Sequence, residues 1–177
     1  MAEGDTLERV KSKQGILSKI QNFFTLGYGT KEDLRELDKK LRDTYYSDLR
    51  DARHICEDVY LAALEAGLTA SSGDFKKVIQ VLDRVTEKIR HADYGYAGLM
   101  DRKGHIREKE LTRVFEYDRA LSNTIKNIMT ALNETYSQSE AAKWTAIPTE
   151  VKRIKNLLRD FENSWREREN QFRPLEV

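Results

Sequence analysis

Residues 74–99, DFKKVIQVLDRVTEKIRHADYGYAGL, decide the fold. Apolar residues recur in this stretch at alternating steps of three and four, beginning with Phe75, Val78 and Leu82. A repeat of about 3.5 residues keeps one stripe of an α-helix facing a partner helix when the helices supercoil left-handedly. The stretch therefore predicts a helix that packs lengthwise against neighbouring helices.

The same spacing recurs twice later in the chain. One stripe lies between residues 111 and 135, and another lies between residues 151 and 172. Additional apolar residues, such as Ile79 and Phe115, flank these stripes and make them wider than the seam of a two-stranded coiled coil. We therefore expect a bundle of several helices.

The helix expected over residues 30–66 has a less regular stripe. Its apolar residues include three consecutive steps of four between residues 37 and 49, which predicts a local unwinding of the supercoil. Thr30 and Asp33 have the spacing of a capping box at the start of this helix, and Gly67 is placed to close its end.

The patterns together predict an all-α fold. We expect an antiparallel up-down-up-down four-helix bundle with left-handed coiled-coil-like packing, preceded by a separate N-terminal amphipathic helix. No segment shows the sustained period-two alternation that would predict a strand. The expected division is residues 1–29 for the N-terminal helix with a glycine-rich linker, and residues 30–177 for a bundle with helices at about 30–66, 74–99, 106–136 and 148–172. Ser71 and Asp74 are expected to cap the helix at 74–99.

The composition excludes several classes of function. The 177 residues include 31 Lys and Arg against 30 Asp and Glu, so a nucleic-acid partner, which would need a basic excess, is not expected. The single cysteine, Cys56, excludes a disulfide framework. The chain has no run of about 18 apolar residues that could cross a membrane, and its first residues do not resemble a secretory signal. We expect a cytoplasmic protein.

Residues 9–26, RVKSKQGILSKIQNFFTL, are the most informative local feature. In a helix of about 100° per residue, their apolar side chains fall within an arc of about 140°. The segment also carries four basic residues and no acidic residue. The candidate partner-binding or membrane-binding residues are Lys13, Ile16, Leu17, Lys19, Ile20, Phe23 and Phe24.

Two interpretations of this segment stay open. A basic amphipathic helix with aromatic residues on its apolar face can lie in the headgroup layer of a membrane. Alternatively, the apolar face docks on the bundle or seals a dimer, with the lysines pointing to water. Gly15 weakens the helix by about 1 kcal/mol relative to alanine, which suits a segment that becomes ordered on contact.

Two charged residues, Asp118 and Arg168, occupy positions on the apolar stripes. A carboxylate buried without a partner is costly, so Asp118 is expected to pair with a cation, accept hydrogen bonds or face a gap in the bundle. Tyr45 and Tyr117 are candidate hydrogen-bond donors. We interpret Asp118 as part of a polar pair that sets the register of the helices, and the alternative is an acid with a shifted pKa in a cavity.

The segment 91–108 is the part of the chain that least resembles a bundle helix. Its Tyr94, Tyr96, Arg102 and Lys103 form a possible interface, because tyrosine and arginine are favoured at protein interfaces and a turn at the bundle tip is accessible. The alternative is that the glycines of this segment serve only a tight turn.

No set of residues with catalytic spacing emerges from the sequence. Asp51 and His54 have the three-residue spacing of a bundle metal site, but such sites need ligands from all four helices, so neither a metal nor another cofactor is expected. Cys56 lies on an apolar stripe and is interpreted as a small buried residue. We expect a non-enzymatic protein that acts through self-association, as a homo-oligomer, or through a protein partner. The alternatives are a peripheral membrane protein that uses residues 9–26 and a helical-bundle metal protein or enzyme.

Overall fold

The protein is all-α in the part of the chain that the structure describes. The computed structural model describes residues 2–26, 30–92 and 108–171. These ranges contain five helices and no strand: α1 Ala2–Leu26, α2 Lys31–Glu65, α3 Thr69–Arg90, α4 Glu108–Glu140 and α5 Ile147–Asn170. The all-α prediction is confirmed.

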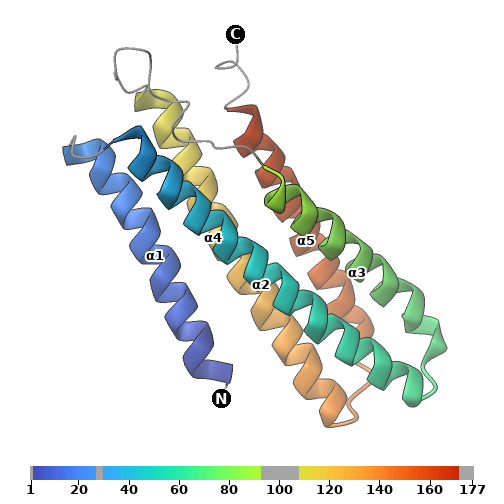
Figure 1. The fold of residues 1–177 in the computed structure, drawn as a ribbon. Helices are drawn as coiled ribbons and strands as arrows, with labels where there is room; N and C mark the ends of the chain where they lie inside the picture. The colour runs from blue at the N-terminus through green and yellow to red at the C-terminus, as the bar shows by residue number, and fades with distance from the viewer. Residues whose placement is uncertain (1, 27–29, 93–107, 172–177) are drawn as a thin grey trace.

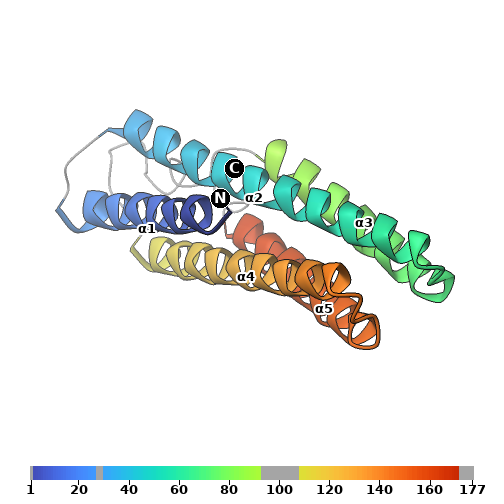
Figure 2. The ribbon, with the colours of Figure 1, turned by 90° about the horizontal axis from the view of Figure 1, so that it is seen from below.

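Four of the helices pack around one core. Helix α2 packs against α3 and α4, and α5 also packs against α3 and α4, so these four helices close a ring (Figures 1 and 2). We call this arrangement the α2–α5 ring. Successive helices run in opposite directions, and the adjacent helices α2 and α4 therefore run in the same direction (Figure 1). Helix α1 lies along α2 and α4.

The core consists of the residues on the apolar stripes. Val78, Leu82, Val85 and Ile89 of α3 are buried, as their spacing predicts. Helices α2, α4 and α5 contribute equivalent stripes, and Leu17 and Ile20 of α1 belong to the same core cluster. The largest buried apolar side chains are Trp165, Tyr45, Phe75 and Phe161.

Both ends of α2 have the predicted structure. The Thr30 backbone N–H donates to Asp33 Oδ2 at 2.6 Å, and the Asp33 backbone N–H donates to Thr30 Oγ1 at 3.2 Å, which completes the capping box. At the other end, Gly67 adopts a φ of 76°, and the Leu68 backbone N–H donates to the Ala63 carbonyl at 2.9 Å. This bond and the left-handed glycine form a Schellman motif that closes the helix.

Helix α3 differs from its expected bounds at both ends. It begins at Thr69 and not at 74, without a side-chain cap, so the expected caps Ser71 and Asp74 lie inside the helix. Gly73 also lies inside it, at a cost of about 1 kcal/mol relative to alanine that the helix tolerates. The helix ends at Arg90, before the expected end at 99, and residues 93–99 lie outside the described residues. Two residues beyond the helix, the Ala92 carbonyl accepts a hydrogen bond from the Arg42 guanidinium.

The last two helices also shift by a few residues. Helix α4 continues to Glu140, beyond the expected end at 136, and the added turn buries Ser139. The chain then turns at Ala142, which has a φ of 52°. Helix α5 begins at Ile147 with Pro148 in its first turn, where the missing proline N–H costs no helical hydrogen bond.

Candidate functional site

The contact between α1 and the α2–α5 ring contains a buried lysine. Within the part of α1 whose side chains are described, three residues are buried: Lys13, Leu17 and Ile20. Ile16 packs against the core from a half-buried position. The Lys13 ammonium donates to Asp48 Oδ2 of α2, and both side chains are about 95% buried. We call Lys13, Leu17, Ile20 and Asp48 the α1 seam.

The docking interpretation predicted that the lysines of this segment point to water, and this is wrong for Lys13. Lys19 and Lys11 are exposed as expected, but Lys13 lies on the buried face. The reason is its position one turn before Leu17, which places it inside the apolar arc of the helix. A lysine is rarely buried unless it is paired, and Asp48 provides the partner.

The remaining predicted residues of this segment are only partly described. Phe23 and Phe24 lie within α1, but their side chains lie outside the description. Tyr94, Tyr96, Arg102 and Lys103 also lie outside the described residues.

The second feature of the site is a set of charged side chains in the interior of the α2–α5 ring, near the ends of α3 and α5. Asp118 is fully buried and pairs with Arg168, whose Nε donates to Asp118 Oδ1 at 2.6 Å. The same guanidinium donates from Nη2 to Asp38 Oδ1 at 2.6 Å. Arg168 of α5 therefore binds one carboxylate on α4 and another on α2.

Arg42 completes this set. Its Nε donates to Asp38 Oδ2 at 3.1 Å, and its Nη1 donates to the Ala92 carbonyl at the end of α3. Two carboxylates and two guanidiniums thus neutralise each other in the interior, as buried charges require. We call Asp38, Arg42, Asp118 and Arg168 the buried charge network, and it connects all four helices of the ring.

Tyr45 packs beside the network. Its hydroxyl donates to the Asp118 backbone carbonyl at 2.9 Å and lies 2.8 Å from Ser122 Oγ. Burial, and then the charge of Asp118, raise the pKa of Tyr45 well above its ordinary value, so the hydroxyl keeps its proton and remains a donor. Tyr45 therefore donates a hydrogen bond to the backbone of the same residue whose carboxylate pairs with Arg168.

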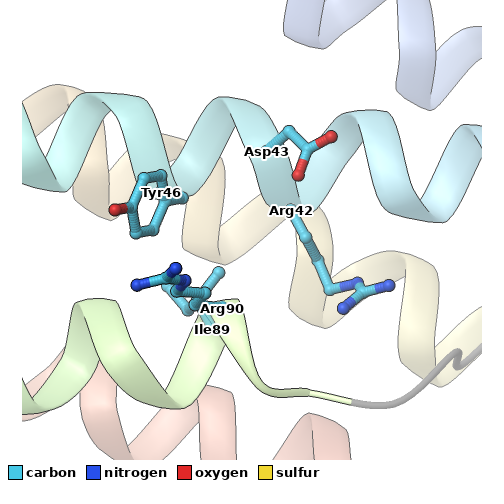
Figure 3. A pocket seen from close by; sticks show the side chains of 5 residues that line it. All are labelled: Arg42, Asp43, Tyr46, Ile89 and Arg90. Atoms are coloured by element: carbon cyan, nitrogen blue, oxygen red, sulfur yellow. The ribbon is translucent and has the colours of Figure 1, made fainter.

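A cavity of about 250 Å³ lies between α2 and α3. Arg42, Asp43, Tyr46, Ile89 and Arg90 line it (Figure 3). Arg42 is held by the buried charge network, and the Arg90 guanidinium lies 3.7 Å from the Glu87 carboxylate. Asp43 adds a negative charge, so the lining of the cavity carries charges of both signs.

The other reactive groups in the described residues show no catalytic arrangement. Burial raises the pKa of the Cys56 thiol to about 12, so the thiol is protonated and unreactive at neutral pH. His54 is exposed, and its Nδ1 lies 3.7 Å from the Glu57 carboxylate. No group of three or more potential metal ligands comes together in residues 2–26, 30–92 and 108–171.

Sequence reasoning missed three members of the site: Asp38, Arg42 and Asp48. Two of them lie on the stripe of α2, because the series Leu34, Asp38, Leu41, Tyr45, Asp48 and Ala52 continues the alternation of three and four. The three consecutive steps of four between residues 37 and 49 arise only when the stripe is read from apolar residues and Asp38 and Asp48 are omitted. The charges of Asp118 and Arg168 on apolar stripes could have predicted further charged residues on the facing stripes, since buried charges require partners.

The chain matches no family model, no curated protein and no solved structure. Among the described residues, none of the helices combines the length and the apolar character that crossing a membrane requires.

Proposed function

We propose that the protein acts by association and not by catalysis, and that α1 is the helix that binds the partner. In this proposal, helices α2–α5 act as one up-down-up-down four-helix bundle, which forms a stable platform, and α1 docks on it reversibly. The observation that supports the proposal is the α1 seam, where the described side chains of α1 contribute two buried aliphatic residues and one ion pair.

The energetics of the seam allow α1 to open while the α2–α5 ring stays folded. Burial of two aliphatic side chains such as Leu17 and Ile20 contributes roughly 3–6 kcal/mol. A buried ion pair such as Lys13–Asp48 adds little, because desolvation offsets its attraction. Opening of α1 should therefore cost less than unfolding of the whole domain, which is typically about 5–15 kcal/mol.

Hydrogen exchange of the full chain tests whether α1 opens. We expect the amides of α1 around Leu17 to exchange at least tenfold faster than those around Leu49 and Ile125, which lie in the centre of the ring. Equal protection of all three regions would show that α1 is a permanent part of the core and would contradict the proposal.

Light scattering over a range of concentrations tests whether α1 mediates association. We expect the wild-type mass to rise with concentration and Leu17→Asp to remain a single chain, because a carboxylate on the buried face prevents docking. Ser18→Asp is the matched control, since Ser18 is exposed on the same helix. Equal association of the wild type and Leu17→Asp would exclude α1 as the element that self-associates.

A second candidate function is binding to an anionic membrane surface. It is favoured by the exposure of Lys11 and Lys19 in a segment without acidic residues. Co-sedimentation with phosphatidylglycerol-containing vesicles tests it, and Lys11→Glu combined with Lys19→Glu should abolish binding. A wild-type chain that ignores these vesicles would exclude this candidate.

A further inference from the structure

We propose that α1 docks in trans, on α2 and α4 of a second copy of this chain. This inference rests on the proposed function, because α1 must first leave its own ring. It assigns the partner of α1 and predicts a dimer in which the two chains exchange their first helices.

The chemistry of the α1 seam points to a second copy. Among the described side chains of α1, the buried face combines Leu17 and Ile20 with Lys13, and α2 places Asp48 opposite that lysine. A partner that buries this face must place a carboxylate opposite Lys13, because an unpaired buried ammonium is strongly destabilising. A second copy carries Asp48 at that position, next to an apolar surface that already fits Leu17 and Ile20.

A bilayer matches this face less well. Lys13 lies between the apolar positions of the arc, so insertion of Leu17 and Ile20 would draw its charge toward the acyl chains. The pairing of Lys13 with one carboxylate gives specificity, since a partner without that carboxylate leaves a buried charge unpaired.

Exchange of α1 between two copies preserves every contact of the seam. The monomer and the exchanged dimer then differ mainly in which ring each α1 contacts and in the entropy of association. The proportion of dimer should therefore rise with protein concentration, while the contacts of Lys13 with Asp48 remain the same in both forms.

Charge exchange at the seam tests the proposal with full-length chains. Lys13→Asp places two carboxylates at the seam, and Asp48→Lys places two ammonium groups there, so neither variant can dock α1 on its own ring. In an equimolar mixture, the carboxylate introduced at position 13 of one chain can pair with the ammonium introduced at position 48 of the other. The native Lys13 and Asp48 that remain on the two chains can pair in the same way. Each of the two seams then contains one ion pair of opposite charges only if the two chains exchange α1.

We expect each single variant to remain a single chain and the mixture to form a one-to-one dimer of the two variants, identified by native mass spectrometry. The double variant with both substitutions restores the pair within one chain, and it should dimerise with concentration as the wild type does. Far-UV circular dichroism confirms that each variant is folded. If Asp48→Lys unfolds α2, Lys13→Glu with Asp48→Arg repeats the test.

Three results would overturn the proposal. The first is a mixture that contains only single chains, although hydrogen exchange shows that α1 of the wild type opens; the proposed function would then survive without this partner. The second is a wild-type dimer that persists in Lys13→Asp. The third is a wild-type chain that binds phosphatidylglycerol vesicles but forms no dimer, which would assign the open α1 to lipid.

Discussion

At the scale of single residues, two helix ends in this protein have the same geometry but different residues. Helix α2 closes with Gly67 at a φ of 76°, and α4 closes with Ala142 at a φ of 52°. In both, the backbone N–H groups of the left-handed residue and of its successor donate back to the last turn: Gly67 to Leu64 and Leu68 to Ala63 in one, Ala142 to Ser139 and Lys143 to Gln138 in the other. Only glycine adopts this conformation without strain from a Cβ atom.

We predict opposite effects of exchanging these two residues. Gly67→Ala should lower the free energy of unfolding by about 1 kcal/mol, and Ala142→Gly should raise it by about 0.5–1 kcal/mol, because the left-handed conformation penalises alanine. Urea unfolding followed by circular dichroism measures both effects. The exposed Ala141, substituted by Gly, is the control and should be neutral or destabilising. Stabilisation by Ala141→Gly as well would show that the effect does not depend on φ.

At the scale of helices, the sequence predicted which residues point inward but not which helices are neighbours. The spacing of three and four placed Leu82, Ile125 and Leu158 in the core correctly, since burial alone determines this pattern. The pattern contains no information on the order of helices around the core. The pairing of Arg168 with both Asp38 and Asp118 depends on that order, and so does the docking of Lys13 on Asp48. Both therefore required the structure.

The contact between α3 and α5 leads to a prediction on pH. Arg84 donates two hydrogen bonds to Glu162, and Lys88 donates a third at 2.7 Å. The Arg84 hydrogen bonds are the main cause that lowers the pKa of Glu162 from 4.5 to about 2, although partial burial opposes them. A carboxyl group with a lowered pKa stabilises the fold above its unfolded pKa, and this contribution is lost as the pH falls through the folded value.

We predict that Glu162→Gln lowers the free energy of unfolding by about 1 kcal/mol at pH 7, since Arg84 and Lys88 are half exposed and solvent screens the pair. The difference from the wild type should shrink below pH 4.5 and disappear near pH 2. Unfolding in urea at a series of pH values measures it. Asp160→Asn, at an exposed position on the same helix, is the control. A difference that is constant with pH would show that Glu162 acts through packing and not through its charge.

At the scale of the whole molecule, the buried charge network stands out because it pairs charges from three helices of the ring, α2, α4 and α5, and also binds the chain just beyond the end of α3. Arg168 reaches Asp118 on α4 and Asp38 on α2, and Arg42 reaches Asp38 and the end of α3. Displacement of α4 or α5 by one turn would separate Arg168 from Asp118 in the interior, which is costly. The network therefore penalises alternative alignments of the helices, as a single polar residue does in a coiled-coil seam.

Two variants separate the contribution of the network to stability from its contribution to alignment. Arg168→Met should lower the free energy of unfolding by about 3–5 kcal/mol, because the buried Asp118 carboxylate loses the ion pair with the Arg168 guanidinium. The double variant Asp118→Leu with Arg168→Met should be within about 1 kcal/mol of the wild type or more stable, since no unpaired charge remains. In this variant Asp38 still pairs with Arg42, and the Tyr45 hydroxyl still donates to the backbone carbonyl of residue 118.

Urea unfolding measures the stability of these variants, and the dispersion of the amide resonances reports whether the helices keep one alignment. If the network sets the register, the double variant should retain its stability but give broadened or multiple amide resonances, because apolar stripes alone tolerate sliding by one heptad. A double variant with a single sharp set of resonances would show that the shapes of Trp165, Phe161 and their neighbours align the helices without any charge. The paired charges would then serve only to fill the interior, and the register would be a property of apolar packing.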